Sequence, residues 1–368
     1  MDSEKAEMQR FFAVIPAGGI GSRLWPMSRA NAPKFLHDLT GNGQTLLQDT
    51  WDRLQPLANG RTMVVTGDVH ARAVADQLPE LDFANVILEP SPRDSTAAIA
   101  LAAAVLAQRE PDVIIGSFAA DHVISDAQAF HKTVEEAVKV AATGKIVTIG
   151  LKPTEASVAF GYIKKGKRLA TDTACEVLEF VEKPDIATAR RYVASDDYLW
   201  NAGMFIAPAA KLLDILAKTQ PTLHSGVVEL AKVWDTEKRD QAMAEIWPTL
   251  TKIAIDYSVA EPAARDGEVA VVPADFEWHD VGDFAAIAEL QSQGRKGHLA
   301  VLGSARVLSD SSSGILVSDT GRLVALIGLE DVIVVDTADA LLVTSKEHAQ
   351  KVKSLVDSLR ESGHSELL

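Results

Sequence analysis

The chain has 368 residues, of which 47% are hydrophobic and 24% charged, and its formal net charge at pH 7 is −15. This composition is ordinary for a globular protein of two domains or of one large domain, and the acidic balance excludes the broad basic surface with which proteins bind nucleic acid. The only cysteine, Cys175, excludes an internal disulfide and a cysteine-based zinc site.

The N-terminal stretch MDSEKAEMQR is polar and has no apolar signal core. The longest stretch of small apolar residues, 97–107, is much shorter than the roughly 20 residues that cross a bilayer. We therefore expect a cytoplasmic protein that binds neither membranes nor nucleic acid. If a chain this acidic binds phosphates, we expect it to do so locally, with backbone amides, a few cations and a metal ion.

From residue 11 to about 150, apolar runs alternate with helical patterns. Strands are predicted at 11–17, 62–67, 85–90, 112–122 and 145–150, and helices at 45–54, 70–78, 96–110 and 129–144. This alternation predicts βαβ units in an α/β fold, with a Rossmann-like, mostly parallel sheet and helices on both faces. Ligands of such sheets bind at the carboxyl ends of the strands.

The second half of the chain is more mixed. Strands are predicted at 160–166, 174–184 and 198–208 and a helix at 185–195; further helices precede the segment 268–284. After the polar stretch 291–298, short β runs at 305–309, 314–318, 322–328, 331–337 and 340–345 predict a small β unit, a partial β-helix. Apolar residues at i, i+3, i+4 and i+7 from Val352 predict a closing amphipathic helix.

Residues 17–35, AGGIGSRLWPMSRANAPKF, follow the first predicted strand. The P-loop pattern GxxxxGK[ST] is absent, and Leu24 stands where a dinucleotide fingerprint requires its third glycine. What remains is a glycine turn whose amides can converge on an anion, with Arg23 and Lys34 as cations. The alternative is an ordinary turn with solvated surface cations, which the spacing of these two residues disfavours.

The motif GGxGxRLxP…PK resembles the signature of the sugar-phosphate nucleotidylyltransferases, and GGIGSRLWPMSR…PKFL resembles their mannose-1-phosphate guanylyltransferase branch. The similarity continues in order through ILEPSPRDSTAAIALAA, AADHVI, FGYI, FVEKPD, WNAGMF, IDYSVAE, WHDVGDF and VVDTADALLV. It implies transfer of GMP from GTP to mannose 1-phosphate, giving GDP-mannose and pyrophosphate. Such a transfer needs positioning and charge stabilisation, and no protein nucleophile.

Two carboxylates are candidates for holding Mg²⁺, which prefers oxygen ligands. Asp121 follows an apolar strand run, and Asp280 lies in the block WHDVGD. By resemblance these residues hold the metal, whereas either one alone would more often be a helix cap or a turn residue. We interpret His122 and His279 as supporting residues rather than ligands or bases, because an ionised phosphate needs no general base.

The remaining site residues follow from the resemblance. Arg23, Lys34, Asp121 and Asp280 are the expected catalytic residues. The nucleotide is expected at Ala17, Gly18, Gly19, Gly21, Ser22, Arg23, Glu89, Asp94, Ser95 and Thr96, and the sugar phosphate at Gly161, Glu182, Lys183 and Asn201. Taken alone, the pair Glu182–Lys183 more often means a surface ion pair before a proline turn, and Trp200 and Trp278 are as compatible with a core as with a site.

The resemblance also marks departures. Residues 93–97 are RDSTA where the family usually has RNTAP, which leaves room for another nucleotide or another sugar phosphate. A regulatory subunit without catalysis would lack some of the four catalytic residues, and a glycosyltransferase would need a DxD motif in a different place.

The expected organisation is a catalytic domain at 1–290, with a nucleotide half (11–150) and a sugar half (151–290), and a β tail at 299–368. The similarity ends where some family members continue into an isomerase domain, so no isomerase activity is expected, and we expect a homodimer.

Overall fold

A computed structural model describes residues 2–292, 295 and 297–368. The polar stretch predicted to separate the two parts of the chain lies partly outside these residues, at positions 293, 294 and 296. Among the described residues, no helix combines the length and the hydrophobicity that a membrane span requires.

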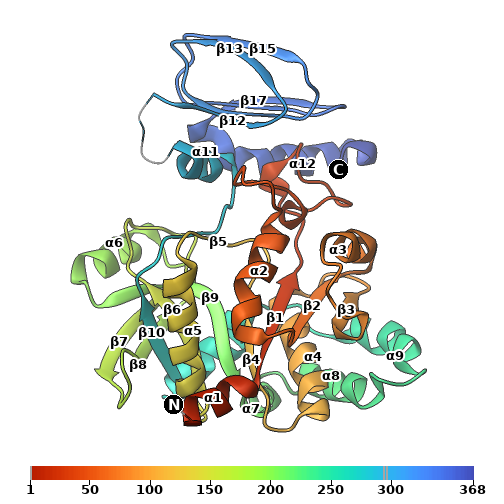
Figure 1. Ribbon diagram of the computed structural model, residues 1–368, viewed down its shortest axis with the longest axis vertical. Helices are drawn as coiled ribbons and strands as arrows, with labels where there is room; N and C mark the ends of the chain where they lie inside the picture. The colour runs from red at the N-terminus through yellow and green to blue at the C-terminus, as the bar shows by residue number, and fades with distance from the viewer. Residues whose placement is uncertain (1, 293–294, 296) are drawn as a thin grey trace.

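A nine-stranded sheet forms the main body, in the order β3-β2-β1-β4-β9-β6-β10-β8-β7 (Figure 1). The strands are β1 (Phe11–Ala17), β2 (Thr62–Gly67), β3 (Val86–Glu89), β4 (Ile114–Ser117), β6 (Ile146–Leu151), β7 (Tyr162–Arg168), β8 (Cys175–Val181), β9 (Tyr198–Pro208) and β10 (Val269–Ala274). The four strands from β3 to β4 are parallel, as the alternating pattern predicts.

Beyond β4 the sheet is mixed. β9 runs antiparallel to both β4 and β6, while β10 is parallel to β6 and antiparallel to β8. The continuous parallel part of the sheet is therefore β3-β2-β1-β4, and β10 with β6 forms the one parallel pair among the remaining pairings of the described strands in this sheet. The predicted strand at 112–122 ends at Ser117, and the rest of that run forms a loop followed by the short strand β5 (Val123–Ile124).

Helices cover both faces of the sheet, as predicted. Buried residues of one face pack with α4 (Asp94–Arg109), α7 (Ala209–Thr219) and α8 (Pro221–Val233), and those of the other face with α2 (Leu46–Ala58), α3 (Ala71–Gln77) and α5 (Ala127–Ala141). Alanines dominate α4 because every side chain from Thr96 to Leu106 is buried. A capping box between Thr45 and Gln48 begins α2. The remaining helices of this part are α1 (Asp2–Gln9), α6 (Ile186–Ser195), α9 (Arg239–Ile246), α10 (Glu261–Arg265) and α11 (Phe284–Ser292).

The C-terminal strands form a small β unit at one end of the molecule (Figure 1). One sheet contains β12 (Leu299–Gly303), β14 (Gly314–Ser318), β16 (Val332–Asp336) and β17 (Leu341–Ser345), and the other contains β13 (Arg306–Asp310) and β15 (Leu323–Ile327). From β12 to β16 the chain alternates between the two sheets, and every pairing in this stretch is parallel. The sequence pattern missed β12. The closing helix begins as a 3-10 turn (Lys346–Lys351) and continues as α12 (Val352–Glu361).

The C-terminal unit packs directly on the opening loop. Leu24 and Trp25 share one buried cluster with Phe284 of α11 and with side chains of β12, β14, β16 and α12. The indole Nε1 of Trp25 donates to the carbonyl of Leu367 at 2.7 Å, and Arg29 Nη2 pairs with Asp339 at 2.7 Å. The end of the chain therefore holds the loop that follows β1.

Candidate active site

The opening loop begins at the carboxyl end of β1. Thr66, in the neighbouring strand β2, donates to the carbonyl of Ala17 at 2.8 Å and fixes the point at which the strand ends. Gly18 and Gly19 are exposed, and Ser22 begins a short 3-10 turn with Arg23 and Leu24. The backbone of this loop is thus open to a ligand at the edge of the sheet where α/β proteins bind theirs.

Gly21 holds Lys34 in place. Gly21 has a φ of 73°, and a Cβ added to it would lie 2.9 Å from Cβ of Lys34. The backbone amide of Lys34 donates to the carbonyl of Ile20 at 3.3 Å, which closes the loop on itself. Only a glycine permits both this left-handed backbone and this close approach of the lysine side chain.

A short antiparallel ladder brings the two aspartates together. β5 pairs with β11 (Trp278–His279), and the register places His279 opposite Val123. The next residues along the two strands are His122 and Asp280. The ladder therefore places side by side two residues that are 158 positions apart in the sequence. Asp121, His122 and Asp280 each offer a ligand atom, and these atoms lie within 4.8 Å of one another.

Lys34 lies between the two carboxylates. Its Nζ is 2.7 Å from Asp121 Oδ2, 4.0 Å from Asp280 Oδ1 and 3.1 Å from the carbonyl of Asp280, to which it donates. Burial acts to lower the pKa of Lys34, but the charges of Asp121 and Asp280 outweigh it and leave the pKa above its ordinary value. Burial acts to raise the pKa of Asp121, and Lys34 reverses that effect. Both groups are therefore charged at neutral pH.

Arg23 lies against the same loop, because a Cβ added to Gly282 would be 3.2 Å from Arg23 Nη1. Arg53 was not singled out in the sequence, yet its Nη2 donates to the carbonyl of His122 at 3.2 Å and its guanidinium lies over Phe130. A lone arginine on the helix α2 gives no sequence signal for this supporting contact.

The donor set fits a divalent cation. Two carboxylates supply hard oxygen ligands, and His122 is buried with no described partner for Nδ1. Burial lowers the pKa of His122, so its ring is neutral at pH 7 and has a lone pair to offer or a hydrogen to donate. His122 Nε2 is 3.9 Å from Asp280 Oδ1, too far for a hydrogen bond, and its ring packs edge-on against Trp278. His279 is half-buried beside this group.

The four residues expected to contact the sugar phosphate also meet. The backbone amide of Asn201 donates to the carbonyl of Gly161 at 2.8 Å. A Cβ added to Gly161 would lie 2.5 Å from Glu182 Oε2. Lys183 forms an ion pair with Glu182, whose side chain is 7% exposed. Gly203 joins this group to the aspartates, since its amide donates to Asn201 Oδ1 at 3.1 Å and an added Cβ would be 3.9 Å from the His122 ring.

Trp200 and Trp278 both pack against the ring of Phe160. Their rings lie 5.1 Å and 5.0 Å from that of Phe160, and Trp200 is buried. Trp278 also packs edge-on against His122, so these aromatic rings connect β9 with the residues around Asp121.

Glu89 lies at the carboxyl end of β3, next to the opening loop. A Cβ added to Gly18 would be 3.7 Å from Glu89 Oε2. Burial raises the pKa of Glu89 to about 7. A carboxyl held this way is ready to accept hydrogen bonds from a ligand that covers it.

The start of α4 is hydrogen-bonded to the loop 253–258. Asp94 is exposed and has a φ of 65°. The Ser95 hydroxyl accepts from the amide of Ile255 at 2.9 Å, and the Thr96 hydroxyl lies 2.7 Å from that of Ser258. Thr96 is fully buried. The hydroxyls of Ser95 and Thr96 therefore support the loop 253–258, and a contact of these residues with the nucleotide stays a prediction.

Asp256 belongs to that loop and was missed among the candidate residues. Its Oδ1 accepts from Asn201 Nδ2 at 3.0 Å. Burial, with the charge of Glu182, raises the pKa of Asp256 to about 7. The motif IDYSVAE contains this residue, but nothing in its local sequence distinguishes it from a helix-capping aspartate.

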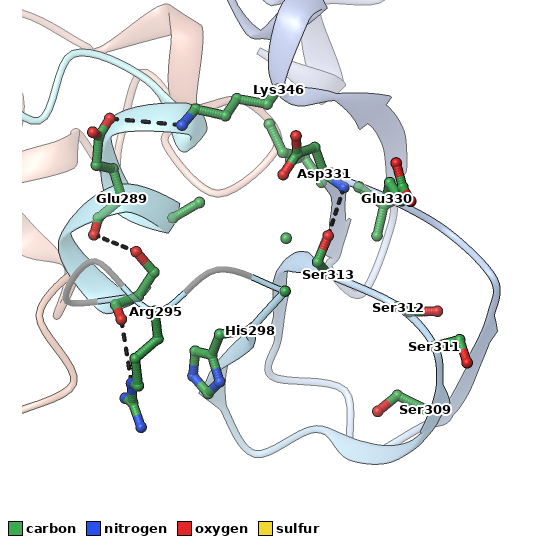
Figure 2. A pocket seen from close by; sticks show the side chains of 16 residues that line it. Glu289, Arg295, His298, Ser309, Ser311, Ser312, Ser313, Glu330, Asp331 and Lys346 are labelled. Carbon is green, nitrogen blue, oxygen red and sulfur yellow. Dashed lines mark hydrogen bonds and ion pairs between the residues drawn. The ribbon is translucent and has the colours of Figure 1, made fainter.

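A separate hollow of about 830 Å³ lies between α11 and the C-terminal strands (Figure 2). Two pairs of its polar groups are in contact: Lys346 Nζ is 3.7 Å from Glu289, and Ser313 Oγ accepts from the amide of Asp331 at 3.0 Å. None of the expected site residues lines it.

Comparison with known proteins identifies the family of this chain. Residues 12–297 match the nucleotidyl transferase family, and residues 305–359 match the MannoseP isomerase/GMP-like beta-helix domain. The xanthan biosynthesis protein XanB of Xanthomonas campestris is 37% identical over 365 residues, which cover 98% of this chain and 75% of that protein.

Two further relatives carry enzyme names. The mannose-1-phosphate guanylyltransferase of Escherichia coli is 34% identical over 97% of this chain and 75% of its own length. A crystal structure named mannose-1-phosphate geranyltransferase, from Thermus thermophilus, superposes with a TM-score of 0.85 at 31% identity, covering 95% of this chain and 99% of the other. The chain therefore belongs to the nucleotidyl transferase family.

Proposed function

We propose that the protein transfers GMP from GTP to α-D-mannose 1-phosphate, producing GDP-mannose and pyrophosphate. The observation that carries the proposal is the convergence of Lys34, Asp121 and Asp280 beside a glycine loop at the edge of the sheet. Relatives named mannose-1-phosphate guanylyltransferase, 34–36% identical over nearly the whole chain, support the choice of substrates.

The nucleotide would bind along the opening loop. Amides of Gly18, Gly19, Gly21 and Ser22, which follow Ala17, can surround the phosphates, and Arg23 and Lys34 supply positive charge. Glu89 can accept hydrogen bonds from the N1 and N2 donors of guanine, a pair that adenine lacks. Asp94 is exposed at the start of α4 and can reach the same end of the nucleotide.

Asp121 and Asp280 would hold Mg²⁺, with His122 behind them. A bound divalent cation would neutralise charge on the phosphates during transfer. Lys34 would then exchange part of its contact with Asp121 for the phosphate oxygens, since its ammonium already lies 2.7 Å from that carboxylate.

The sugar phosphate would bind between Gly161, Glu182, Lys183 and Asn201. Lys183 can meet its phosphate and Glu182 a hydroxyl, while the missing side chain at Gly161 leaves room for the Glu182 carboxylate beside it. A sugar-phosphate oxygen attacks the α-phosphorus of GTP; the new P–O bond forms there, and the bond to the bridging oxygen breaks and releases pyrophosphate. The attacking oxygen is ionised at pH 7, so catalysis depends on alignment and charge.

The proposal also covers the organisation of the chain. Residues 1–290 would form the catalytic domain, with a nucleotide half and a sugar half, and 299–368 the C-terminal unit. Both sheets of that unit carry exposed apolar side chains, namely Leu308, Leu323, Ile327, Leu341 and Val343. Such a surface suits a homodimer, and light scattering would reveal it as twice the mass of one chain.

Pyrophosphate release by the purified protein tests the function. GTP, ATP, UTP and dTTP would be combined with mannose, glucose and N-acetylglucosamine 1-phosphates, with and without Mg²⁺. We expect GTP with mannose 1-phosphate to dominate, and Asp121→Asn or Asp280→Asn to lower turnover by at least about 100-fold without changing the circular dichroism spectrum. Turnover dominated by another pair of substrates would contradict the specificity, and full turnover by both variants would contradict the metal site.

A further inference from the structure

Asp256 lies beside the sugar-phosphate residues without a role in the function proposed so far. It is the first residue of the π-helix Asp256–Ala260 and is half-buried. The side chains nearest to it are Asn201, which donates to its Oδ1 at 3.0 Å, and Glu182 and Lys183, whose charges act on it. It therefore lies in the same group as three of the four residues proposed to contact the sugar phosphate.

Asn201 has no acceptor position left for a sugar hydroxyl and keeps only one hydrogen of its Nδ2 as a donor. Its Oδ1 accepts from the Thr148 hydroxyl at 2.8 Å and from the Gly203 amide at 3.1 Å, and its Nδ2 donates to Asp256. These two donors fix the orientation of the amide, so Nδ2 must face Asp256. Asn201 is also buried. The geometry makes Asn201 a residue that aims Asp256, and it leaves Asp256 as the group with acceptor positions to spare.

Asp256 has that capacity because a carboxylate offers about four acceptor positions. Asn201 and the backbone amide of Asp256 itself use two of them. The negative charge of the neighbouring Glu182 acts on Asp256. Among the described side chains, only Lys183 supplies a donor beside these two carboxyls, and it pairs with Glu182. Two adjacent carboxyls of this kind are well matched by a ligand with several hydroxyl donors.

The loop that carries Asp256 is fixed from the far side. Ser95 accepts from the amide of Ile255 at 2.9 Å, and Thr96 pairs with Ser258 at 2.7 Å, so the loop is attached on both sides of Asp256 to the start of α4. Rigid support of this kind is what a specificity residue requires, because a displaced acceptor no longer selects among hydroxyls.

We propose that Asp256 is a specificity-determining residue that accepts a hydrogen bond from a ring hydroxyl of the hexose 1-phosphate, next to Glu182. The inference rests on the proposed function, since it assigns one more contact within the same sugar site. A purely structural Asp256 would serve only to hold Asn201.

The test combines substitutions in the protein with deoxy derivatives of its substrate, in the manner of a double-mutant cycle. The full-length wild type and the variants Asp256→Ala and Asp256→Asn would be assayed, at saturating GTP, with mannose 1-phosphate and its 2-, 3-, 4- and 6-deoxy derivatives. Removing the hydroxyl that Asp256 binds should lower kcat/KM of the wild type about tenfold to 100-fold. For Asp256→Ala, kcat/KM with mannose 1-phosphate should be lower than that of the wild type by a similar factor. The deoxy sugar that lacks the bound hydroxyl should have the same kcat/KM with Asp256→Ala as with the wild type.

Asp266→Ala is the matched control, because it removes an exposed carboxylate at the end of α10, in the same segment. We expect it to keep the wild-type ranking of the deoxy sugars. The KM for GTP should change by less than about twofold in all variants, since only sugar contacts are altered. Asp256→Asn preserves shape and an acceptor for Asn201, so it keeps the test valid if Asp256→Ala folds poorly.

Equal losses for every deoxy sugar in the wild type and in both variants would overturn the proposal and leave Asp256 as a support for Asn201. The failure of the proposed function is distinguishable from this outcome. If the wild type prefers another hexose 1-phosphate, the mannose assignment is wrong, and the same cycle with the deoxy derivatives of that sugar still decides the role of Asp256.

Discussion

Gly21 illustrates how a residue without a side chain can contribute to catalysis. Its φ is 73°, and an added Cβ would lie 2.9 Å from Cβ of Lys34. Gly60 has a similar φ of 81°, but nothing lies within 4 Å of its added Cβ. An alanine at either position costs about 1–2 kcal/mol in backbone strain, whereas only the one at position 21 also displaces the lysine.

We therefore predict that Gly21→Ala lowers kcat for pyrophosphate release by about tenfold or more, because a shift of about 1 Å in a catalytic group is enough for such a loss. Gly60→Ala should lose a comparable free energy of unfolding and keep its kcat. Urea unfolding and steady-state assays on both variants would check this. Equal kcat values for the two variants would show that Lys34 tolerates the displacement.

Single residues were predicted best where their chemistry is visible in a motif. Arg23, Lys34, Asp121 and Asp280 do meet, although their assigned roles remain proposals. Asp256 could not be found this way, because its importance comes from contacts with Asn201, 55 positions away. Its local sequence is that of any aspartate at the start of a helix.

At the scale of elements, one buried contact joins α4 to the π-helix that begins at Asp256. The hydroxyls of Thr96 and Ser258 lie 2.7 Å apart, and both residues are fully buried. Thr96→Val or Ser258→Ala alone should cost about 1–3 kcal/mol, since each leaves the other hydroxyl without its partner. The double variant should cost clearly less than the sum of the two, and urea unfolding of the four proteins would measure the difference. Strict additivity would mean that the pair does not join the two elements.

Elements were predicted well wherever the local pattern determines them. The alternation in the first 150 residues predicted the strands and helices of the parallel half, because buried parallel strands form continuous apolar runs. The antiparallel direction of β9 could not be predicted in this way, since it depends on pairing with β4 and β6 over long sequence distances. β12 was missed because its short run Leu299–Gly303 directly adjoins the polar stretch 291–298.

At the scale of the whole molecule, the C-terminal unit supports the site from outside. The block WHDVGD leads directly into α11. Its Asp283, the residue before this helix, is buried and accepts from the amide of Ala286 at 3.0 Å. Gln350, in the turn before α12, donates to the other oxygen of Asp283. The sequence predicted the strands and the helix of this unit but not this contact, because Gln350 lies 67 positions from Asp283 and has no motif.

This arrangement makes a final prediction, which compares two side chains of the same turn. Gln350→Ala leaves the buried carboxylate of Asp283 without its donor, and we expect it to lower the free energy of unfolding by about 1–3 kcal/mol. It should also lower kcat, because Asp283 anchors the loop that begins at Asp280. Lys346→Ala removes a largely exposed pair with Glu289 at 3.7 Å, and its effect on stability should stay within about 1 kcal/mol. Urea unfolding and pyrophosphate release would distinguish the two variants; if Gln350→Ala matched Lys346→Ala in both, the C-terminal unit would cover the site without positioning it.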